Sequence, residues 1–274
     1  MKNIYQLEEA GSGLIGHWFW FMLGSLADLN QNSHSYHITL QDKQLTQYQI
    51  ESFEILKDIV TYYPDFSNAL PLASVYPKNS IVTKWNNLFF IKKIIYETFI
   101  DKKYIKFLNK IFSIGLSKNF NNTIRKFPKK IYIKRHNSQF SKGNANDGDK
   151  KNIIRRQIIN ENELCEYLTK KNFFCIQAEE LHVGEKLLLF ENAKCILAPN
   201  GGGLVYSFMC KKNTSLIEIV AKDPHQWVNQ YHDISHILGL KWRRYQDVKK
   251  LDYYDNINVD ISKIDKYLKK NSII

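Results

Sequence analysis

The sequence is poor in cysteine, and its cysteines do not cluster. The 4 cysteines, Cys165, Cys175, Cys195 and Cys210, form no CxxC pair and no Cys/His group. Zinc sites and disulfide frameworks both need such groups, so neither is indicated. Single cysteines beside apolar runs are usually buried thiols. We therefore expect no metal site and a reducing compartment.

An apolar stretch long enough to cross a bilayer is also lacking. The run "LIGHWFWFML" from Leu14 to Leu23 is too short, contains His17, and follows Glu8 and Glu9 instead of a basic segment. Neither a membrane span nor a signal peptide is indicated. We expect a soluble, cytoplasmic protein that at most associates peripherally with the membrane face.

Acidic residues are also few in comparison with basic residues. Lys and Arg number 39 against 27 Asp and Glu, which gives a net charge of +12 with neutral histidines. Such an excess is typical of proteins that bind phosphate groups, acidic acceptors, nucleic acids or anionic membrane surfaces. The lysines are spread along the chain and no recognised RNA or DNA motif occurs, so we do not expect a nucleic-acid partner.

The chain does contain two regions in which helical and strand-like patterns alternate. Its 274 residues can form two ordinary cores. A polar, basic stretch with a proline, "NNTIRKFPKK" at 121–130, separates the two regions. We place the boundary there and predict an N-terminal domain at 1–127 and a C-terminal domain at 128–274.

The patterns predict the secondary structure of each region. In the first, helices are expected at 14–29, 46–62 and 88–112, and strands at 35–40, 71–76 and 80–83. In the second, strands are expected at 131–135, 173–177, 195–199, 215–220 and 241–245, with helices at 160–171, 185–192, from 203, at 226–238 and at 260–270. This alternation is typical of parallel βαβ units, so the predicted fold class is α/β.

A polar loop follows the first strand of the second region. Residues 136–152 are rich in Asn, Gly, Asp and Lys and have almost no apolar side chains. Such a segment is not part of a core. A lid over a site and a plain surface insertion explain it equally well.

Three consecutive glycines, Gly201 to Gly203, follow the apolar run "CILAP" and precede a helical pattern. In βαβ layers, ligands bind beyond the carboxyl ends of the strands, where N–H groups at a helix start favour an anion. Glycines would let a diphosphate approach the backbone, whereas a tight turn with positive φ is the competing explanation. The run does not have the GxGxxG spacing, and the chain has no GxxxxGK[ST] motif.

Two further features could complete such a site. Arg155 and Arg156 precede the helix at 160–171, and a guanidinium group can donate two hydrogen bonds to a phosphate; a solvated basic turn is the alternative. Glu218 lies inside the apolar strand "SLIEIV". An ionised carboxylate there is costly unless it is exposed, paired or bound to a ligand. It could accept both hydroxyl groups of a ribose, and exposure at a sheet edge is the alternative.

The order of these pieces resembles glycosyltransferase family 61. Over residues 131–245 the chain reads "IYIKR", "RQIINENEL", "EKLLLFENAKCILAPNGGGLVYSFM" and "LIEIV", in the order of the second domain of that family. The stretch "GHWFWFMLGSLADL" at 16–29 is similar to the His-Trp helix of its first domain. Phe21 stands at an acidic position of that helix, and Asn200 stands where the family has a glycine-loop histidine.

The resemblance implies two Rossmann-like domains facing a cleft, the GT-B type. It also implies an inverting, metal-independent transfer of a sugar from a nucleoside diphosphate donor, usually a uridine diphosphate (UDP) sugar, to a hydroxyl group of a glycan or glycolipid. No cofactor is implied, because helix N-termini and arginines can neutralise the leaving diphosphate. The implied donor-binding residues are Arg135, Arg156 with Arg155 in reserve, Asn200, Gly201, Gly202, Gly203 and Glu218.

The acceptor-side domain would supply the catalytic base. His17 is the candidate, since an imidazole can take a proton from the attacking hydroxyl near neutral pH. A histidine that only packs its helix among Trp18, Phe19 and Trp20 explains the pattern equally well.

Two other functions stay open at this point. A non-catalytic family member that binds a nucleotide sugar or a glycan would keep the donor site and lack turnover. A nucleic-acid-binding protein would account for the net charge and would show a steep salt dependence of binding to arbitrary oligonucleotides.

Overall fold

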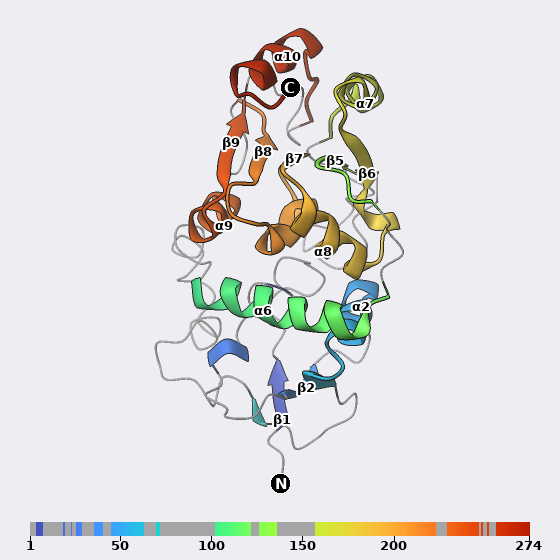
Figure 1. Ribbon diagram of the computed structural model, residues 1–274, viewed down its shortest axis with the longest axis vertical. Helices are drawn as coiled ribbons and strands as arrows, with labels where there is room; N and C mark the ends of the chain where they lie inside the picture. The colour runs from blue at the N-terminus through green and yellow to red at the C-terminus, as the bar shows by residue number, and fades with distance from the viewer. Residues whose placement is uncertain are drawn as a thin grey trace, which may run out of the picture. The chain divides into compact units, whose positions relative to one another are not determined.

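The computed structural model describes residues 4–7, 19, 23, 26–28, 36–40, 45–62, 70–71, 102–121, 126–135, 157–222, 229–246, 248, 251 and 256–274. The chain divides into two compact units, 1–123 and 124–274 (Figure 1). Each unit holds a parallel sheet with helices, so the predicted α/β class is confirmed. The predicted domain limits of 1–127 and 128–274, with their acceptor and donor roles, remain predictions.

The first unit contains a four-stranded parallel sheet in the order β3-β2-β1-β4. Its strands are β1 (Ile4–Leu7), β2 (Tyr36–Leu40), β3 (Val60–Tyr62) and β4 (Leu70–Pro71). The helices are η2 (Leu26–Asp28), α2 (Gln47–Leu56) and α6 (Lys102–Asn119). Of the predicted strand at 71–76 only residue 71 is described, and it lies in β4. The predicted strand at 80–83 and most of the predicted helix at 14–29 lie outside the described residues.

Helix α2 is shorter than the sequence pattern predicts. It starts where Gln49 Oε1 accepts a hydrogen bond from the backbone N–H of Thr46 (2.8 Å), and it ends at Leu56. The predicted continuation to residue 62 is wrong, because Val60, Thr61 and Tyr62 form β3 and pair with β2. Branched and aromatic side chains of this kind favour a strand over a helix when a neighbouring strand is available.

Close packing of α2 against α6 forms much of the first core. A Cβ added to Gly115 would lie 2.5 Å from the carbonyl oxygen of Ile55, so the two helices approach to backbone contact there. Asn119 Nδ2 donates to the same carbonyl oxygen (3.0 Å), and the rings of Phe19 and Phe112 lie 5.6 Å apart. None of the helices in the described parts of the chain is both long and apolar enough to cross a membrane.

The second unit contains a five-stranded parallel sheet in the order β6-β5-β7-β8-β9. The strands are β5 (Lys130–Lys134), β6 (Phe174–Gln177), β7 (Cys195–Pro199), β8 (Ser215–Ile219) and β9 (Lys241–Tyr245). Strands β7 and β9 have the bounds that the sequence predicts. This order, second-first-third-fourth-fifth along the chain, is a doubly wound arrangement with helices on both faces of the sheet.

Figure 1 shows α7 (Glu161–Lys170) and α10 (Ile261–Lys270) on one side of this sheet. Helices α8 (Val183–Asn192), η4 (Gly202–Met209) and α9 (Gln230–Leu238) lie on the other side, and η3 (Ala178–Glu180) follows β6. The helix predicted from residue 203 is η4, a 3-10 helix. The helix predicted at 226–238 is described from residue 230, and the loop 136–152 lies outside the described residues.

The core under α7 and α10 joins distant parts of the chain. In β7, β8 and β9 the apolar side chains at odd positions, such as Leu197 and Ile217, pack against Leu164 and Leu168 of α7 and against Ile264 of α10. The even positions of these three strands face the opposite side, since side chains alternate along a strand. Glu218 and Arg244 therefore lie on the face covered by α8, α9 and η4.

Candidate functional site

The candidate site lies at the carboxyl edge of the second sheet, between β5 and β7. These neighbouring strands are connected onward in opposite directions, β5 to β6 on one side and β7 to β8 on the other. Ligands of doubly wound sheets bind at such a switch point. Arg135 follows β5, and Asn200 and Gly201 follow β7, so three predicted donor-binding residues meet there.

Arg135 and the glycine loop are in direct contact. Nη1 of Arg135 donates a hydrogen bond to the carbonyl oxygen of Asn200 (2.9 Å), and a Cβ added to Gly201 would overlap this nitrogen. A Cβ on Gly203 would lie 3.0 Å from Cγ2 of Ile133. Among the described glycines only Gly239 has a left-handed φ, 67°. Gly201 and Gly203 therefore allow close approach of neighbouring side chains, and the tight-turn explanation with positive φ is wrong.

The carbonyl groups of the loop are turned away from its N–H groups. The Asn200 carbonyl oxygen accepts from Arg135, and the Gly201 carbonyl oxygen accepts from the hydroxyl of Tyr231 and from the N–H of Leu204 (3.1 Å). The N–H and C=O of one peptide group point in opposite directions. Fixing both carbonyl groups thus fixes the direction of the Gly201 and Gly202 N–H groups.

The N–H groups of Gly201, Gly202 and Gly203 have no acceptor among the described residues. They stand at the start of η4, where the helix leaves its first donors unpaired. Gly202 is exposed and the other two are half-buried. Successive N–H groups beside a guanidinium charge form a concave anion-binding feature.

Glu161 positions the end of β5. Its Oε1 accepts hydrogen bonds from the hydroxyl of Tyr132 (2.8 Å) and from the backbone N–H of Arg135 (3.1 Å). Burial raises the pKa of the Glu161 carboxyl, and these two hydrogen bonds oppose that shift. Burial together with the Glu161 charge raises the pKa of Tyr132 well above its ordinary range. The pair ties the first turn of α7 to the strand that carries Arg135.

Asn160, the preceding residue, anchors the same turn to the end of the chain. Its Nδ2 donates to the carbonyl oxygen of Val259 (2.8 Å), and its Oδ1 accepts from the Val259 N–H (2.9 Å). Ile158 and Ile257 form a parallel β-bridge beside this pair. The Asn-Glu dipeptide of the sequence motif is therefore structural in its contacts, and its two side chains hold the frame around Arg135.

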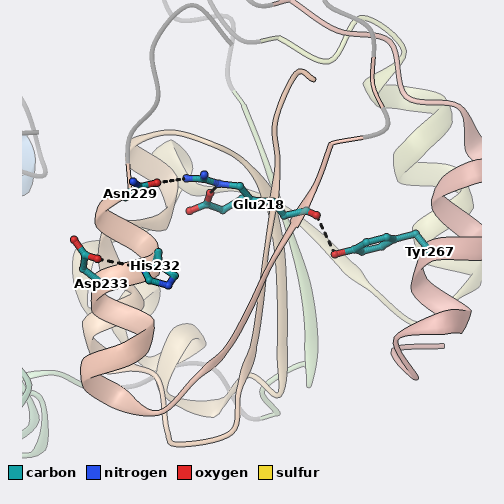
Figure 2. Close-up of polar contacts among 6 residues, drawn as sticks. Glu218, Asn229, His232, Asp233 and Tyr267 are labelled. Carbon is teal, nitrogen blue, oxygen red and sulfur yellow. Dashed lines mark hydrogen bonds and ion pairs between the residues drawn. The ribbon is translucent and has the colours of Figure 1, made fainter. Parts of the chain in front are cut away.

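Glu218 is fully buried and paired. It is in register with Ala198 of β7 and Arg244 of β9, and Arg244 Nε donates to its Oε2 (2.9 Å). Arg244 Nη2 also donates to Oδ1 of Asn229 (3.2 Å), the residue before α9. Figure 2 shows Glu218 and Asn229 near one another beside α9. Burial raises the pKa of the Glu218 carboxyl, and Arg244 opposes that shift. The alternative explanation, exposure at a sheet edge, is wrong, and Arg244 pairs with one oxygen of the buried carboxylate.

Two predicted site residues cannot be placed. His17 and Arg156, together with the reserve Arg155, lie outside the described residues. Among the described residues no group of three or more His, Cys, Asp or Glu side chains is arranged to hold a metal ion, and the absence of a metal site stays a prediction.

Sequence reasoning missed Glu161, Tyr231 and Arg244 as parts of the site. Arg244 had the clearest signal, because β9 carries two adjacent arginines and follows the strand that holds the buried acid, which needs a charged partner. The contact between Tyr231 and the Gly201 carbonyl had no signal, since it joins a helix face to a loop.

The sequence profile of the family described as Glycosyltransferase 61 matches residues 15–217, more than half of the chain. The matched segment contains Arg135, Glu161 and the glycine loop, and it ends one residue before Glu218. No curated protein matches the chain significantly.

Proposed function

Since the chain belongs to the glycosyltransferase 61 family, we propose that it is an inverting glycosyltransferase. The donor is a nucleoside diphosphate sugar, with UDP as the nucleotide. The acceptor is a hydroxyl group of a glycan or glycolipid. The two units form a GT-B pair of Rossmann-like domains, with the second as the donor domain. Polysaccharide biosynthesis in the cytoplasm, with peripheral association at the membrane face, belongs to the same proposal.

The observation that carries the donor assignment is the glycine loop with Arg135. Three successive N–H groups without an acceptor among the described residues lie at a helix start, beside a guanidinium group that touches the loop backbone. A diphosphate supplies several anionic oxygens for such donors. Fixed donors of this kind stabilise charge that develops on a leaving group, and they act without reorganisation during the reaction.

The reaction is a single displacement at the anomeric carbon. The acceptor oxygen forms a bond to that carbon from the face opposite the diphosphate, and the bond from carbon to the phosphate oxygen breaks. The proton of the acceptor hydroxyl passes to the base, for which His17 is our candidate. The electron pair leaves with the diphosphate. The negative charge that develops there is stabilised by Arg135, Arg156 and the N–H groups of Gly201 to Gly203.

The metal-free part of the proposal needs a direct control. The polar segment 136–152, which lies outside the described residues, contains one Asp-x-Asp spacing, Asp147 and Asp149. Two carboxylates at this spacing are a possible Mg²⁺ ligand set. Ligand binding is therefore measured in the presence of a chelator and repeated with added Mg²⁺ and Mn²⁺.

A thermal-shift and calorimetric titration with UDP tests the proposal. In excess chelator, UDP at about 100 times its Kd should stabilise the protein by roughly 2.7 kcal/mol. Binding that appears only with a divalent cation would overturn the metal-free arrangement. Absence of UDP binding under every condition would overturn the donor assignment. Binding of nucleotide sugars without sugar transfer or hydrolysis would identify a non-catalytic family member.

A further inference from the structure

One oxygen of the buried Glu218 carboxylate is uncommitted. Oε2 accepts from Arg244, but Oε1 is buried and has no hydrogen-bond partner among the described residues. Trp242 of β9 and Asn200 of the loop after β7 lower the pKa of the carboxyl as side-chain hydrogen-bonding groups. Neither completes a hydrogen bond of normal geometry to Oε1, and the indole N–H of Trp242 is itself buried without an acceptor among the described residues. A buried carboxylate oxygen without a donor is costly and calls for a ligand or a rearrangement.

Arg244 is held so that it can serve only one side of this carboxylate. Its Nε donates a hydrogen bond to Glu218 Oε2, and its Nη2 donates one to Asn229 Oδ1. Its guanidinium group lies 4.9 Å from the ring centroid of Trp242. The side chain of Arg244 is only 12% exposed. Contacts on three sides restrict the guanidinium rotation, so it cannot move across to cover Oε1 without giving up Asn229.

From this geometry we propose that Arg244 is a positioning residue of the donor site. It keeps Glu218 ionised and leaves Oε1 to receive a hydroxyl group of the donor ribose. The inference rests on the proposed function, since it assigns the ribose to Glu218. It adds a residue beyond the segment matched by the family profile and explains how a fully buried acid can act as an acceptor.

The physical reason is the charge state of the acid. Burial favours the protonated carboxyl, and a protonated carboxyl offers a donor where the ribose hydroxyl needs an acceptor. Arg244 is the charged group that acts on Glu218 from β9. Helix α9 carries four titratable groups: Tyr231, whose hydroxyl donates to Gly201, His232, whose ring lies 4.8 Å from that of Trp242, its partner Asp233 (3.2 Å), and His236. On the same face, Lys186 of α8 lies over the ring of Tyr206 of η4 (5.6 Å). Ala198, the register partner of Glu218 on β7, and Asn200, in the loop after β7, do not titrate.

The test is the pH profile of UDP affinity, measured by calorimetry on the full chain. In Arg244→Gln the pKa of Glu218 should rise further, so the affinity should begin to fall at a higher pH than in the wild type. At a pH where the wild type still binds fully, the variant should bind at least about tenfold more weakly, which corresponds to one pKa unit. UDP's own titration is common to both proteins and cancels in the comparison.

Matched variants isolate the cause. Arg243→Gln removes the same charge from the neighbouring position, whose side chain faces α10, and should keep the wild-type profile. His232→Gln should also keep it, which excludes imidazole titration as the source. Adding Glu218→Gln to Arg244→Gln should abolish the shift, because no carboxyl is left to titrate.

A conservative variant keeps the test informative if Arg244→Gln does not fold. Arg244→Lys retains the charge, but one ammonium group on a flexible chain cannot hold both Glu218 and Asn229. We expect a shift of the profile in the same direction and of smaller size. Profiles of Arg244→Gln or Arg244→Lys that coincide with the wild type, or a shift that survives Glu218→Gln, would overturn the inference while UDP binding itself stands. Failure of the wild type to bind UDP would overturn the proposed function first.

Discussion

Arg135 occupies the space in which a side chain on Gly201 would begin. Its Nη1 donates to the Asn200 carbonyl oxygen (2.9 Å) and would overlap a Cβ on Gly201. The guanidinium group can therefore lie against the loop only while position 201 is glycine. The position of the Arg135 side chain therefore depends on the absence of a side chain at position 201.

Gly201→Ala should weaken UDP binding by displacing Arg135. We expect a loss of about tenfold, or roughly 1.4 kcal/mol. In an Arg135→Ala background the same substitution should have little further effect, because no guanidinium is left to displace. Calorimetric titration of the two single variants and the double variant measures this coupling. Additive losses would show that the methyl group acts on the ligand itself.

Glu161→Gln should change the pH dependence of stability while keeping the frame around Arg135. Both hydrogen bonds end on Oε1, which the amide oxygen can replace. Burial raises the Glu161 pKa above its ordinary 4.5, so its favourable contribution is present below that value and is lost as pH rises through the folded-state pKa. Relative to the wild type, the variant should gain stability as pH rises from the ordinary carboxyl pKa of 4.5 through the raised folded-state pKa of Glu161. Urea unfolding across this range is the measurement, and a constant difference would contradict it.

Cys175 should be the fastest of the four thiols to react. Side-chain hydrogen bonding with the neighbouring Cys165 thiol, helped by Thr169 and the Lys134 charge, lowers the pKa of Cys175 to about 7. Burial raises the pKa of Cys195 to about 12 and raises that of Cys210. Iodoacetamide labelling followed by peptide mass spectrometry should show Cys175 modified first, with a rate that rises through about pH 7. Cys175→Ser should remove the fast phase and Cys210→Ser should leave it.

His17→Ala should separate donor binding from chemistry. A base acts only as the acceptor hydroxyl attacks, so its loss lowers turnover and leaves ground-state donor contacts unchanged. We expect a fall in sugar transfer of about 10²–10⁴-fold at unchanged UDP affinity. Nucleotide release and calorimetry measure the two quantities. Normal turnover with early thermal unfolding would identify a packing histidine.

Gly115→Ala should destabilise the first unit. Replacing a glycine inside a helix by alanine normally stabilises the folded protein by about 1 kcal/mol. Here the added Cβ would lie 2.5 Å from the Ile55 carbonyl oxygen, and the clash should produce a net loss of about 1–2 kcal/mol. Ser113→Ala, at an exposed position of the same helix, should be neutral or slightly stabilising. Equal stabilities of the two variants by urea unfolding would disprove close packing of α2 and α6.

The second sheet and much of its site could be predicted from local pattern. Strand β7 is an uninterrupted apolar run, and a parallel βαβ alternation places Arg135 and Gly201 at one edge whatever the details. The partner of Glu218 could not be predicted in the same way. The pairing of Glu218 with Arg244 depends on a register between β8 and β9, and register is set by packing of the whole layer.

Errors in the first unit have a different cause. The segment from residue 46 to residue 62 has helical spacing throughout, but pairing with β2 takes its last three residues into β3. Tertiary pairing overrides a local preference of a few tenths of a kcal/mol per residue. The chain also carries a Gly-x-Gly-x-x-Gly spacing at Gly11, Gly13 and Gly16, in a stretch after β1 that lies outside the described residues.

The two hydrogen bonds between Asn160 and Val259 join residues 99 positions apart. During synthesis on the ribosome, α7 and the strands beside it emerge long before Val259 and the α10 residues Ile264 and Leu268 that cover the same core. One apolar face of the nascent sheet therefore stays exposed to solvent until nearly all of this unit has been translated. Contacts of such long range are slow to form, and they expose intermediates to aggregation. Dependence on chaperones during translation should accordingly be concentrated in the second unit.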